Sequence, residues 1–162
     1  MRSLSPIVPG FWRVDLGVVN AYVSSWQDQW VLIDTGNPGD QTDILRALRQ
    51  LGVDPQDLSA IIVTHHHPDH AGGLAALIEA TGAEVWMHAA DAAEVRVGNG
   101  TRDVILTSGL LNWTLNRLFI RPKPERYEPA GVAHEVADGG ALPGGLVAVH
   151  TPGHSAGHLA LW

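Results

Sequence analysis

The N-terminal part of the chain alternates apolar and polar residues in short runs that turn residues separate. Across residues 11–26, apolar side chains recur around Gly17 and Asn20, a pattern typical of a β-hairpin at the start of a sheet. A second strand is predicted over residues 29–33, because the apolar residues there run into the dense turn-forming stretch 34–39.

Helical spacing follows directly after this turn. Ile44, Leu45, Leu48 and Leu51 lie on one helical face, and Gly52 ends the run, so an amphipathic helix is predicted over residues 40–51. The strand-then-helix pattern then repeats. It predicts strands over residues 60–64 and 84–88, and helices over about 72–81 and 89–97.

The C-terminal part of the chain favours one more helix and several short strands. The helix is expected over residues 103–120, where the apolar period is imperfect, and a loop with three prolines is expected over 121–131. Short strands are predicted over residues 133–136, 146–150 and 158–162. Strands that alternate with helices in this way predict an α/β fold.

The composition is typical of a globular chain with one domain. Hydrophobic residues make up 45 % of the 162 residues, which is enough to bury one core. The start lacks the apolar stretch of a secretory signal, and no run approaches the roughly 20 apolar residues that span a bilayer, so we expect a cytoplasmic protein with no membrane contact. The net charge of −7 disfavours nucleic acid and favours a small-molecule partner.

Residues 65–70 contain four histidines and an aspartate directly after an apolar run. In an extended segment, side chains two residues apart point the same way, so His65 and His67 can bind one ion. The turn at Pro68 redirects Asp69 and His70, which therefore imply a second, adjacent ion. Because the chain has no cysteine, a transition metal must be held by imidazole and carboxylate, which favours zinc, manganese or iron.

A catalytic zinc site has about three protein ligands and one open position, so a third histidine is needed beside the first two. His154 is the best candidate, because it lies in a turn rich in glycine and proline after an apolar strand. His88, His134 and His150 are isolated, and residues of that kind are more often ordinary core or loop residues. The cluster at 65–70 has no packing rationale, since each buried imidazole would need a hydrogen-bond partner.

These motifs resemble those of one known family. Residues 65–70 match the His-x-His-x-Asp-His signature of the metallo-β-lactamase superfamily, and the run Thr-Pro-Gly-His-Ser-Ala-Gly-His at 151–158 resembles its next signature. Residues 34–36, Asp-Thr-Gly, lie where that family has a turn after a strand. The chain is most similar to the glyoxalase II-like and general metallo-hydrolase branch. The resemblance implies an αββα sandwich, with residues 1–162 forming one domain that contains mainly its N-terminal half and the start of the second sheet.

The resemblance also implies the roles of the site residues. Its metal ligands would be His65, His67 and His154 for the first ion, and Asp69 and His70 for the second. Asp69 would also be catalytic by orienting or relaying a proton. Asp34 would support a ligating imidazole from outside the metal shell, or alternatively bond the amides of its own turn. His158 would be an outer group beside His154, and His66 is expected to face substrate or solvent.

The function that the resemblance implies is a zinc-dependent hydrolase, in which a metal-bound hydroxide attacks an ester, thioester or related acyl bond of a small molecule. A complete domain would hold two zinc ions, with iron or manganese as alternatives. An iron persulfide dioxygenase of the same fold, or a metal-binding fragment without catalysis, is the competing interpretation. The family's bridging aspartate and final histidine have no counterpart here, and the chain ends within an apolar strand, so we expect a domain that is incomplete at its C-terminus. The alternative is a natural short form with an incomplete second metal site.

Overall fold

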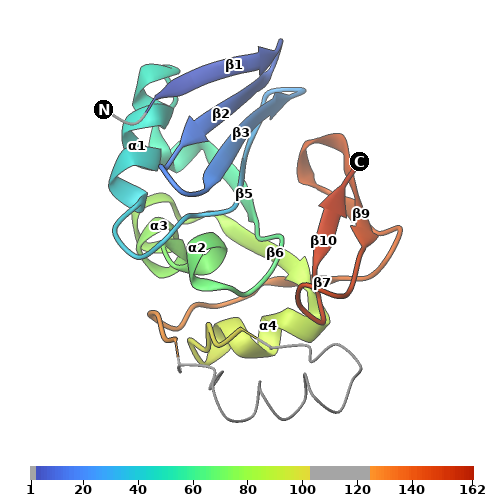
Figure 1. Ribbon diagram of the computed structural model, residues 1–162. Helices are drawn as coiled ribbons and strands as arrows, with labels where there is room; N and C mark the ends of the chain where they lie inside the picture. Colours follow the sequence, from blue (N-terminus) through green and yellow to red (C-terminus); the bar gives the residue numbers. More distant parts are fainter. Residues whose placement is uncertain (1–2, 103–124) are drawn as a thin grey trace, which may run out of the picture.

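Two β-sheets organise the part of the chain that the computed structural model describes, residues 3–102 and 125–162 (Figure 1). The helix expected over 103–120 lies outside these residues. The seven strands of the large sheet are in chain order: β1 (Leu4–Val8), β2 (Phe11–Asp15), β3 (Asn20–Trp26), β4 (Gln29–Ile33), β5 (Leu58–Ile62), β6 (Glu84–His88) and β7 (His134–Val136). The small sheet has the order β10 (Leu159–Leu161), β9 (Leu146–His150), β8 (Ala141–Leu142).

The large sheet changes from antiparallel to parallel at β4. Strands β1 to β4 pair antiparallel, whereas β4 to β7 pair parallel. Parallel neighbours need a crossover connection. These connections contain α1 (Gln41–Gln50), α2 (Pro68–Ala71), α3 (Leu74–Thr81) and α4 (Ala89–Arg96), together with a 3-10 turn at Pro55–Asp57. A second 3-10 turn, Pro143–Gly145, connects β8 and β9 of the small sheet. The carboxyl ends of β4, β5 and β6 therefore meet at one edge of the sheet.

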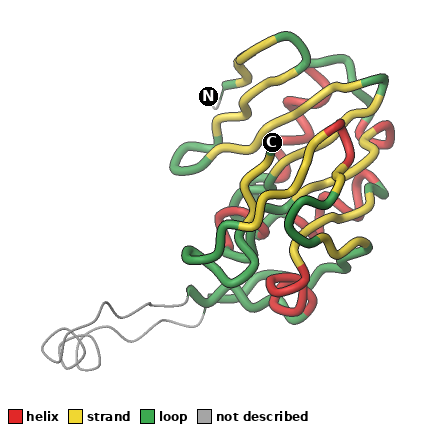
Figure 2. The backbone as a smooth tube through the Cα atoms, turned by 90° about the vertical axis from the view of Figure 1, so that its right-hand side faces the viewer, coloured by secondary structure: helices red, strands yellow, loops and turns green. Residues whose placement is uncertain are grey.

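Both faces of the large sheet are buried. Leu32 and Ile61 belong to the core that contains the apolar faces of α1 and α3, whereas their neighbours Val31 and Ile62 pack in a second cluster with Leu159 of the small sheet. Successive strand residues point to opposite faces, which explains why β4 and β5 end in the continuous apolar runs 30–33 and 60–62. Figure 1 shows α1 and α3 on one side of the large sheet and the small sheet on the other, and Figure 2 views the molecule from the side of the small sheet, with the C-terminus in front.

This arrangement confirms the expected sandwich of helices, sheet and sheet. Strands β4, β6 and β9 coincide with their predicted residues, and β2 and β3 form the predicted hairpin. Strand β5 begins two residues earlier than expected and ends at Ile62, because the next part of the chain turns into the histidine loop. No helix among the described residues combines the length and apolar character needed to cross a bilayer.

Two strands and one α-helix were not predicted from the sequence. Strand β1 contains Pro6 and lies at the sheet edge, where proline is tolerated but the strand pattern is weak. Strand β8 has only two residues. The short helix α2 begins at Pro68 within the expected histidine loop, because proline is favoured in the first turn of a helix.

A substitution at Gly73 tests how closely the start of α3 approaches the chain that follows β4. A Cβ atom at Gly73 would lie 2.5 Å from the carbonyl oxygen of Thr35, so Gly73→Ala forces backbone segments apart. We expect this substitution to lower the free energy of unfolding by about 1–3 kcal/mol in urea titrations. Gly131→Ala is the matched control, because no neighbouring atom lies within 4 Å. Equal stability changes in the two variants would contradict the close approach.

Candidate metal centre

The carboxyl ends of the parallel strands bring the chemical groups of the sequence together. Asp34 directly follows β4, the histidine loop (residues 64–70) follows β5, and Asp91 lies in the first turn of α4 after β6. The small sheet supplies the 151–158 turn, which connects β9 and β10. The C-terminal end of this turn is held against the histidine loop, because the backbone N–H of Leu159 donates to the carbonyl oxygen of Thr64 at 2.9 Å.

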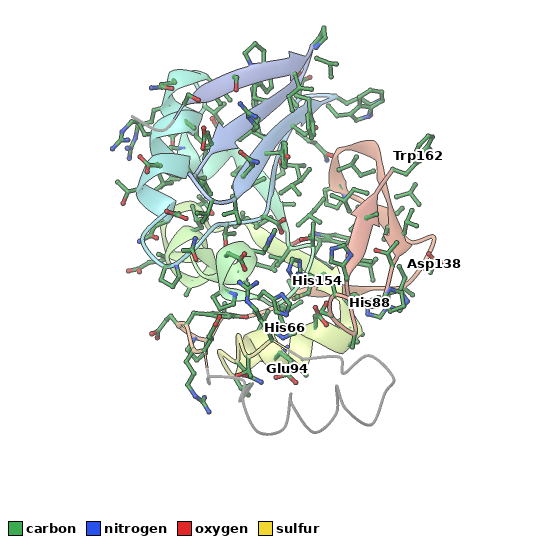
Figure 3. The ribbon with its side chains drawn as sticks, viewed as in Figure 1. His66, His88, Glu94, Asp138, His154 and Trp162 are labelled. Atoms are coloured by element: carbon green, nitrogen blue, oxygen red, sulfur yellow. The ribbon has the colours of Figure 1, made fainter. Side chains whose placement is uncertain are left out.

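Three imidazoles from the two sheets form a compact cluster. The ring centroids of His65, His67 and His154 lie 4.7 Å from one another in all three pairs. One ring nitrogen from each comes within 4.8 Å of the other two, a spacing that a single metal ion can bridge. His65 and His67 are buried and His154 is exposed. Figure 3 shows His154 of the small-sheet unit beside the loop that carries His66.

Two of these rings have buried nitrogens without a hydrogen-bond partner among the described residues. They are Nε2 of His65 and Nε2 of His67. The other ring nitrogen of His65, Nδ1, lies 3.0 Å from the hydroxyl oxygen of Thr64, which orients the ring. A buried polar atom without a hydrogen-bond partner lowers the stability of the fold by about 1–3 kcal/mol, so a bound ligand that pairs with these atoms would be stabilising. An all-imidazole set with no thiolate fits zinc, iron or manganese.

The electrostatics of the cluster keep its inner rings neutral. Burial, with a smaller effect from the neighbouring histidines, lowers the pKa of His65 to about 2. Burial and the nearby His66 and His154 rings lower the pKa of His67 to about 4. Near neutral pH both rings therefore keep the lone pair that a metal ion needs.

Asp34 connects the ends of two strands to His70. Its Oδ2 lies 2.8 Å from Nδ1 of His70, and its Oδ1 accepts the backbone N–H of Thr64 at 2.8 Å. The backbone N–H and the hydroxyl of Thr35 both donate to the carbonyl oxygen of His70. Asp34 is buried and has a φ of +60°, a conformation that aspartate tolerates better than most residues. The carboxylate thus orients the His70 ring.

Asp69 and His70 form a second group beside the three rings. Nε2 of His70 lies 3.9 Å from Oδ2 of Asp69, and the His70 ring centroid is 4.1 Å from that of His65. Burial alone would raise the pKa of Asp69, but His70 and Arg102 outweigh it and lower that pKa. Nη2 of Arg102 donates to Oδ1 of Asp69 at 2.8 Å. The sequence analysis missed Arg102, which belongs to no motif and approaches only through the fold.

His66 corrects one expectation. It was predicted to face substrate or solvent, yet only 4 % of it is exposed. Its Nδ1 lies 3.1 Å from Oδ2 of Asp91, close enough for an ion pair, and its Nε2 lies 3.3 Å from the carbonyl oxygen of Thr101. The hydroxyl of Tyr127 donates to the His66 carbonyl oxygen at 2.7 Å. Helix α4 and the segments after it cover this side of the loop, which the sequence pattern could not show.

The remaining histidines lie outside the three-ring cluster. His158 forms part of its wall, with a ring centroid 5.1 Å from that of His65 and its Nδ1 2.8 Å from the hydroxyl oxygen of Thr151. His88 and His150 stack on each other with centroids 4.0 Å apart. His134 stacks on Trp86, also at 4.0 Å.

Curated proteins similar to this chain include hydroxyacylglutathione hydrolases and an uncharacterized protein. Hydroxyacylglutathione hydrolase of Pseudomonas aeruginosa (strain LESB58) is 35 % identical over 105 residues, covering 65 % of this chain and 28 % of that protein. The same-named protein of Albidiferax ferrireducens is 58 % identical over 50 residues, covering 31 % of this chain and 18 % of that protein. The uncharacterized protein YobT of Bacillus subtilis (strain 168) is 30 % identical over 149 residues, covering 88 % of this chain and 55 % of that protein.

Solved structures match nearly the whole chain. A Cronobacter sakazakii metallo-beta-lactamase with a HARLDQ motif has a TM-score of 0.79 at 28 % identity, covering 98 % of this chain and 56 % of that protein. The metallo-beta-lactamase MIM-1 of Novosphingobium pentaromativorans has a TM-score of 0.78 at 28 % identity, with 98 % and 54 % covered. The chain thus spans a little over half the length of these structures. Since the family model described as the metallo-beta-lactamase superfamily matches residues 14–162, the chain belongs to that superfamily.

Proposed function

We propose that this chain provides the metal-binding part of a zinc-dependent hydrolase that cleaves thioesters of the hydroxyacylglutathione class. The observation that carries the proposal is the pair of buried, unpartnered Nε2 atoms of His65 and His67 beside the ring of His154. These three side chains would hold the first ion. When bound, zinc supplies Lewis-acid chemistry that makes water a nucleophile near neutral pH.

Asp69 and His70 are the proposed ligands of a second ion. Asp34 would keep the His70 ring in place, because its carboxylate holds Nδ1 and leaves Nε2 facing Asp69. Arg102 occupies Oδ1 of Asp69 and leaves Oδ2 on the side of His70. We assign to Asp69 the further role of orienting the attacking water and passing its proton on. His158 is proposed as an outer group that limits the cluster on the small-sheet side.

The thioester substrate is supported by the similar proteins rather than by the geometry of the site. The similar proteins named hydroxyacylglutathione hydrolase are 35 % identical over 105 residues and 58 % identical over 50 residues, whereas the two structures named metallo-beta-lactamase are 28 % identical over 98 % of the chain. Water would add to the thioester carbonyl, the C–S bond would break, and the products would be a hydroxy acid and free glutathione. A small anionic substrate suits a site where Arg102 is close to the proposed ions.

The stability of the metal-free protein should depend on pH through His65 and His67. In the folded state their pKa lies well below the usual 6.5, so on acidification the unfolded chain takes up protons that the folded chain does not. Their contribution to stability is complete above pH 6.5 and is lost as pH falls, down to about 4 for His67 and about 2 for His65. His66 and His70 have a raised pKa, since Asp91 and Asp34 outweigh burial, so they add no slope below pH 6.5.

Urea unfolding in the presence of EDTA, between about pH 7 and 4.5, measures this dependence. The double variant His65→Asn/His67→Asn is the comparison, because it lacks both groups. Its unfolding free energy should change less over the same range. Equal slopes for the two proteins would show that these rings are not held neutral by the fold.

Metal removal and loss of one ligand should abolish the same activity. We expect EDTA to stop hydrolysis of a hydroxyacylglutathione thioester and added Zn²⁺ to restore it, with thiol release as the measurement. His67→Ala should lower kcat/KM by about a thousandfold, equivalent to about 4 kcal/mol of transition-state stabilisation. His134→Ala is the control, because that ring stacks on Trp86 away from the cluster.

The same experiment separates the competing functions. Bound iron together with oxygen consumption on a glutathione persulfide would replace the hydrolase by a dioxygenase. Tight zinc binding without hydrolysis of any thioester, ester or lactone would leave a metal-binding module without catalysis. Either result contradicts the proposed reaction while keeping the three-histidine site.

Asp34 should matter for the second ion more than for the first. Asp34→Asn places an amide where the carboxylate holds His70, and we expect it to weaken the second zinc site by about 10–100-fold in calorimetric titrations. Asp138→Asn is the matched control, because Asp138 also accepts a backbone N–H, from His150, but lies outside the site. If Asp34→Asn weakened both sites equally, the carboxylate would support the whole loop and not His70 in particular.

A further inference from the structure

Asp91 is a buried carboxylate for which the proposed reaction has no use. Only 1 % of it is exposed, and it lies in the first turn of α4. Its Oδ1 accepts the backbone N–H of Gly157 at 2.6 Å, and its Oδ2 accepts the hydroxyl of Ser155 at 2.6 Å and the backbone N–H of His66 at 3.1 Å. One side chain therefore connects α4, the histidine loop and the 151–158 turn.

The contacts of Asp91 are strong enough to fix these segments. Burial alone would raise the pKa of Asp91, but the donors around it, with the His66 ring and Ser155 foremost, hold that pKa far below its usual value. A buried carboxylate that stays ionised makes charge-assisted hydrogen bonds, about twice as strong as neutral ones. Removing the carboxylate would leave the Ser155 hydroxyl and two backbone N–H groups without their acceptor.

The residues that donate hydrogen bonds to Asp91 are close in sequence to the proposed metal ligands, both in the histidine loop and in the 151–158 turn. Ser155 directly follows His154, and His66 lies between His65 and His67. His154 is itself exposed, so burial of its own side chain does not determine where its ring lies. Gly157 shows how close the approach is, because a Cβ atom there would lie 2.7 Å from Oδ1 of Asp91.

We propose that Asp91 is a positioning residue, which holds the 151–158 turn against the histidine loop and so brings His154 within reach of the ion that His65 and His67 bind. This inference rests on the proposed function, because it concerns the geometry of the same metal site. Asp91 acts through the backbone of His66 and Gly157 and through Ser155. It makes no bond to the metal or to the substrate.

The chemistry of the contacts predicts that asparagine cannot replace Asp91. Its carbonyl oxygen can lie on the side of Gly157 or on the side of His66, but not on both. In either orientation the amide NH₂ faces a backbone N–H, so donor meets donor and the two loops are pushed apart. Asp91→Asn should therefore behave like Asp91→Ala at the metal site, although it conserves size.

The experiment measures metal binding to the full chain, with Zn²⁺ affinity from competition against a chromophoric chelator and with the visible spectrum of bound Co²⁺. Asp91→Asn and Asp91→Ala should weaken Zn²⁺ binding by about 10–100-fold, the usual effect of an outer group that orients ligands. The Co²⁺ spectrum should change as well, because a displaced His154 alters the coordination number. Ser155→Ala removes a single contact and should have a smaller effect in the same direction.

Thr81→Val is the matched control for a simple loss of stability. Thr81 is a buried hydroxyl at the end of α3 that bonds the Leu77 carbonyl and the Ala83 N–H, away from the histidines. It should destabilise the fold while leaving the Zn²⁺ affinity and the Co²⁺ spectrum unchanged. All titrations are made at a temperature where circular dichroism shows each variant folded.

The outcomes separate this inference from the proposed function. If the unmodified chain binds no Zn²⁺, the proposed function fails and the inference with it. If the chain binds Zn²⁺ and the Asp91 variants bind it equally well with the same Co²⁺ spectrum, the positioning role is overturned and the proposed function stands. Should the Asp91 variants not fold, Ser155→Ala and Gly157→Ala decide: weaker binding in both supports the role, and unchanged binding in both overturns it.

Discussion

The apolar layer between the two sheets is the constraint on which the rest of the structure depends. His65 and His67 lie in the loop that follows β5 of the large sheet, and His154 lies in the turn between β9 and β10 of the small sheet, so the three rings meet only if the sheets pack together. Leu159 is almost fully buried in that layer, and its N–H bonds the carbonyl of Thr64 at the start of the histidine loop. Burying a side chain of this size contributes about 1.5–3 kcal/mol, more than one ordinary hydrogen bond.

The histidines at the centre of the cluster and those on either side of it have pKa values shifted in opposite directions. The inner rings of His65 and His67 are kept neutral, chiefly by burial. On either side, His66 and His70 lie against buried carboxylates, and both have a raised pKa. The carboxylates thus orient the outer parts of the loop, while the lone pairs at its centre remain free. A divalent cation then meets His65 and His67 as neutral donors and displaces no protons from these two rings.

Sequence reasoning located groups where the information is local. The run 65–70 stands out by its own composition, and a turn after an apolar strand was enough to select His154, whose ring lies beside those of His65 and His67. Sequence reasoning failed for side chains that come together only in the folded structure. Asp91 and Arg102 belong to no motif, and their contacts reach residues 25 or more positions away. The expectation for His66 was wrong because alternation in an extended chain predicts only that its side chain points away from those of its neighbours. Alternation does not predict which other segments of the fold cover that side.

The origin of the ligands in both sheets ties metal binding to folding. An ion held by His65, His67 and His154 joins segments 87 residues apart in sequence, and the unfolded chain has no comparable site. Binding to the folded state alone stabilises it by about 2.7 kcal/mol when free metal exceeds the dissociation constant a hundredfold. The same ion would give the two unpaired Nε2 atoms the partner that the fold withholds. These two buried ring nitrogens, which lack a hydrogen-bond partner among the described residues, are therefore the atoms that would bind the metal.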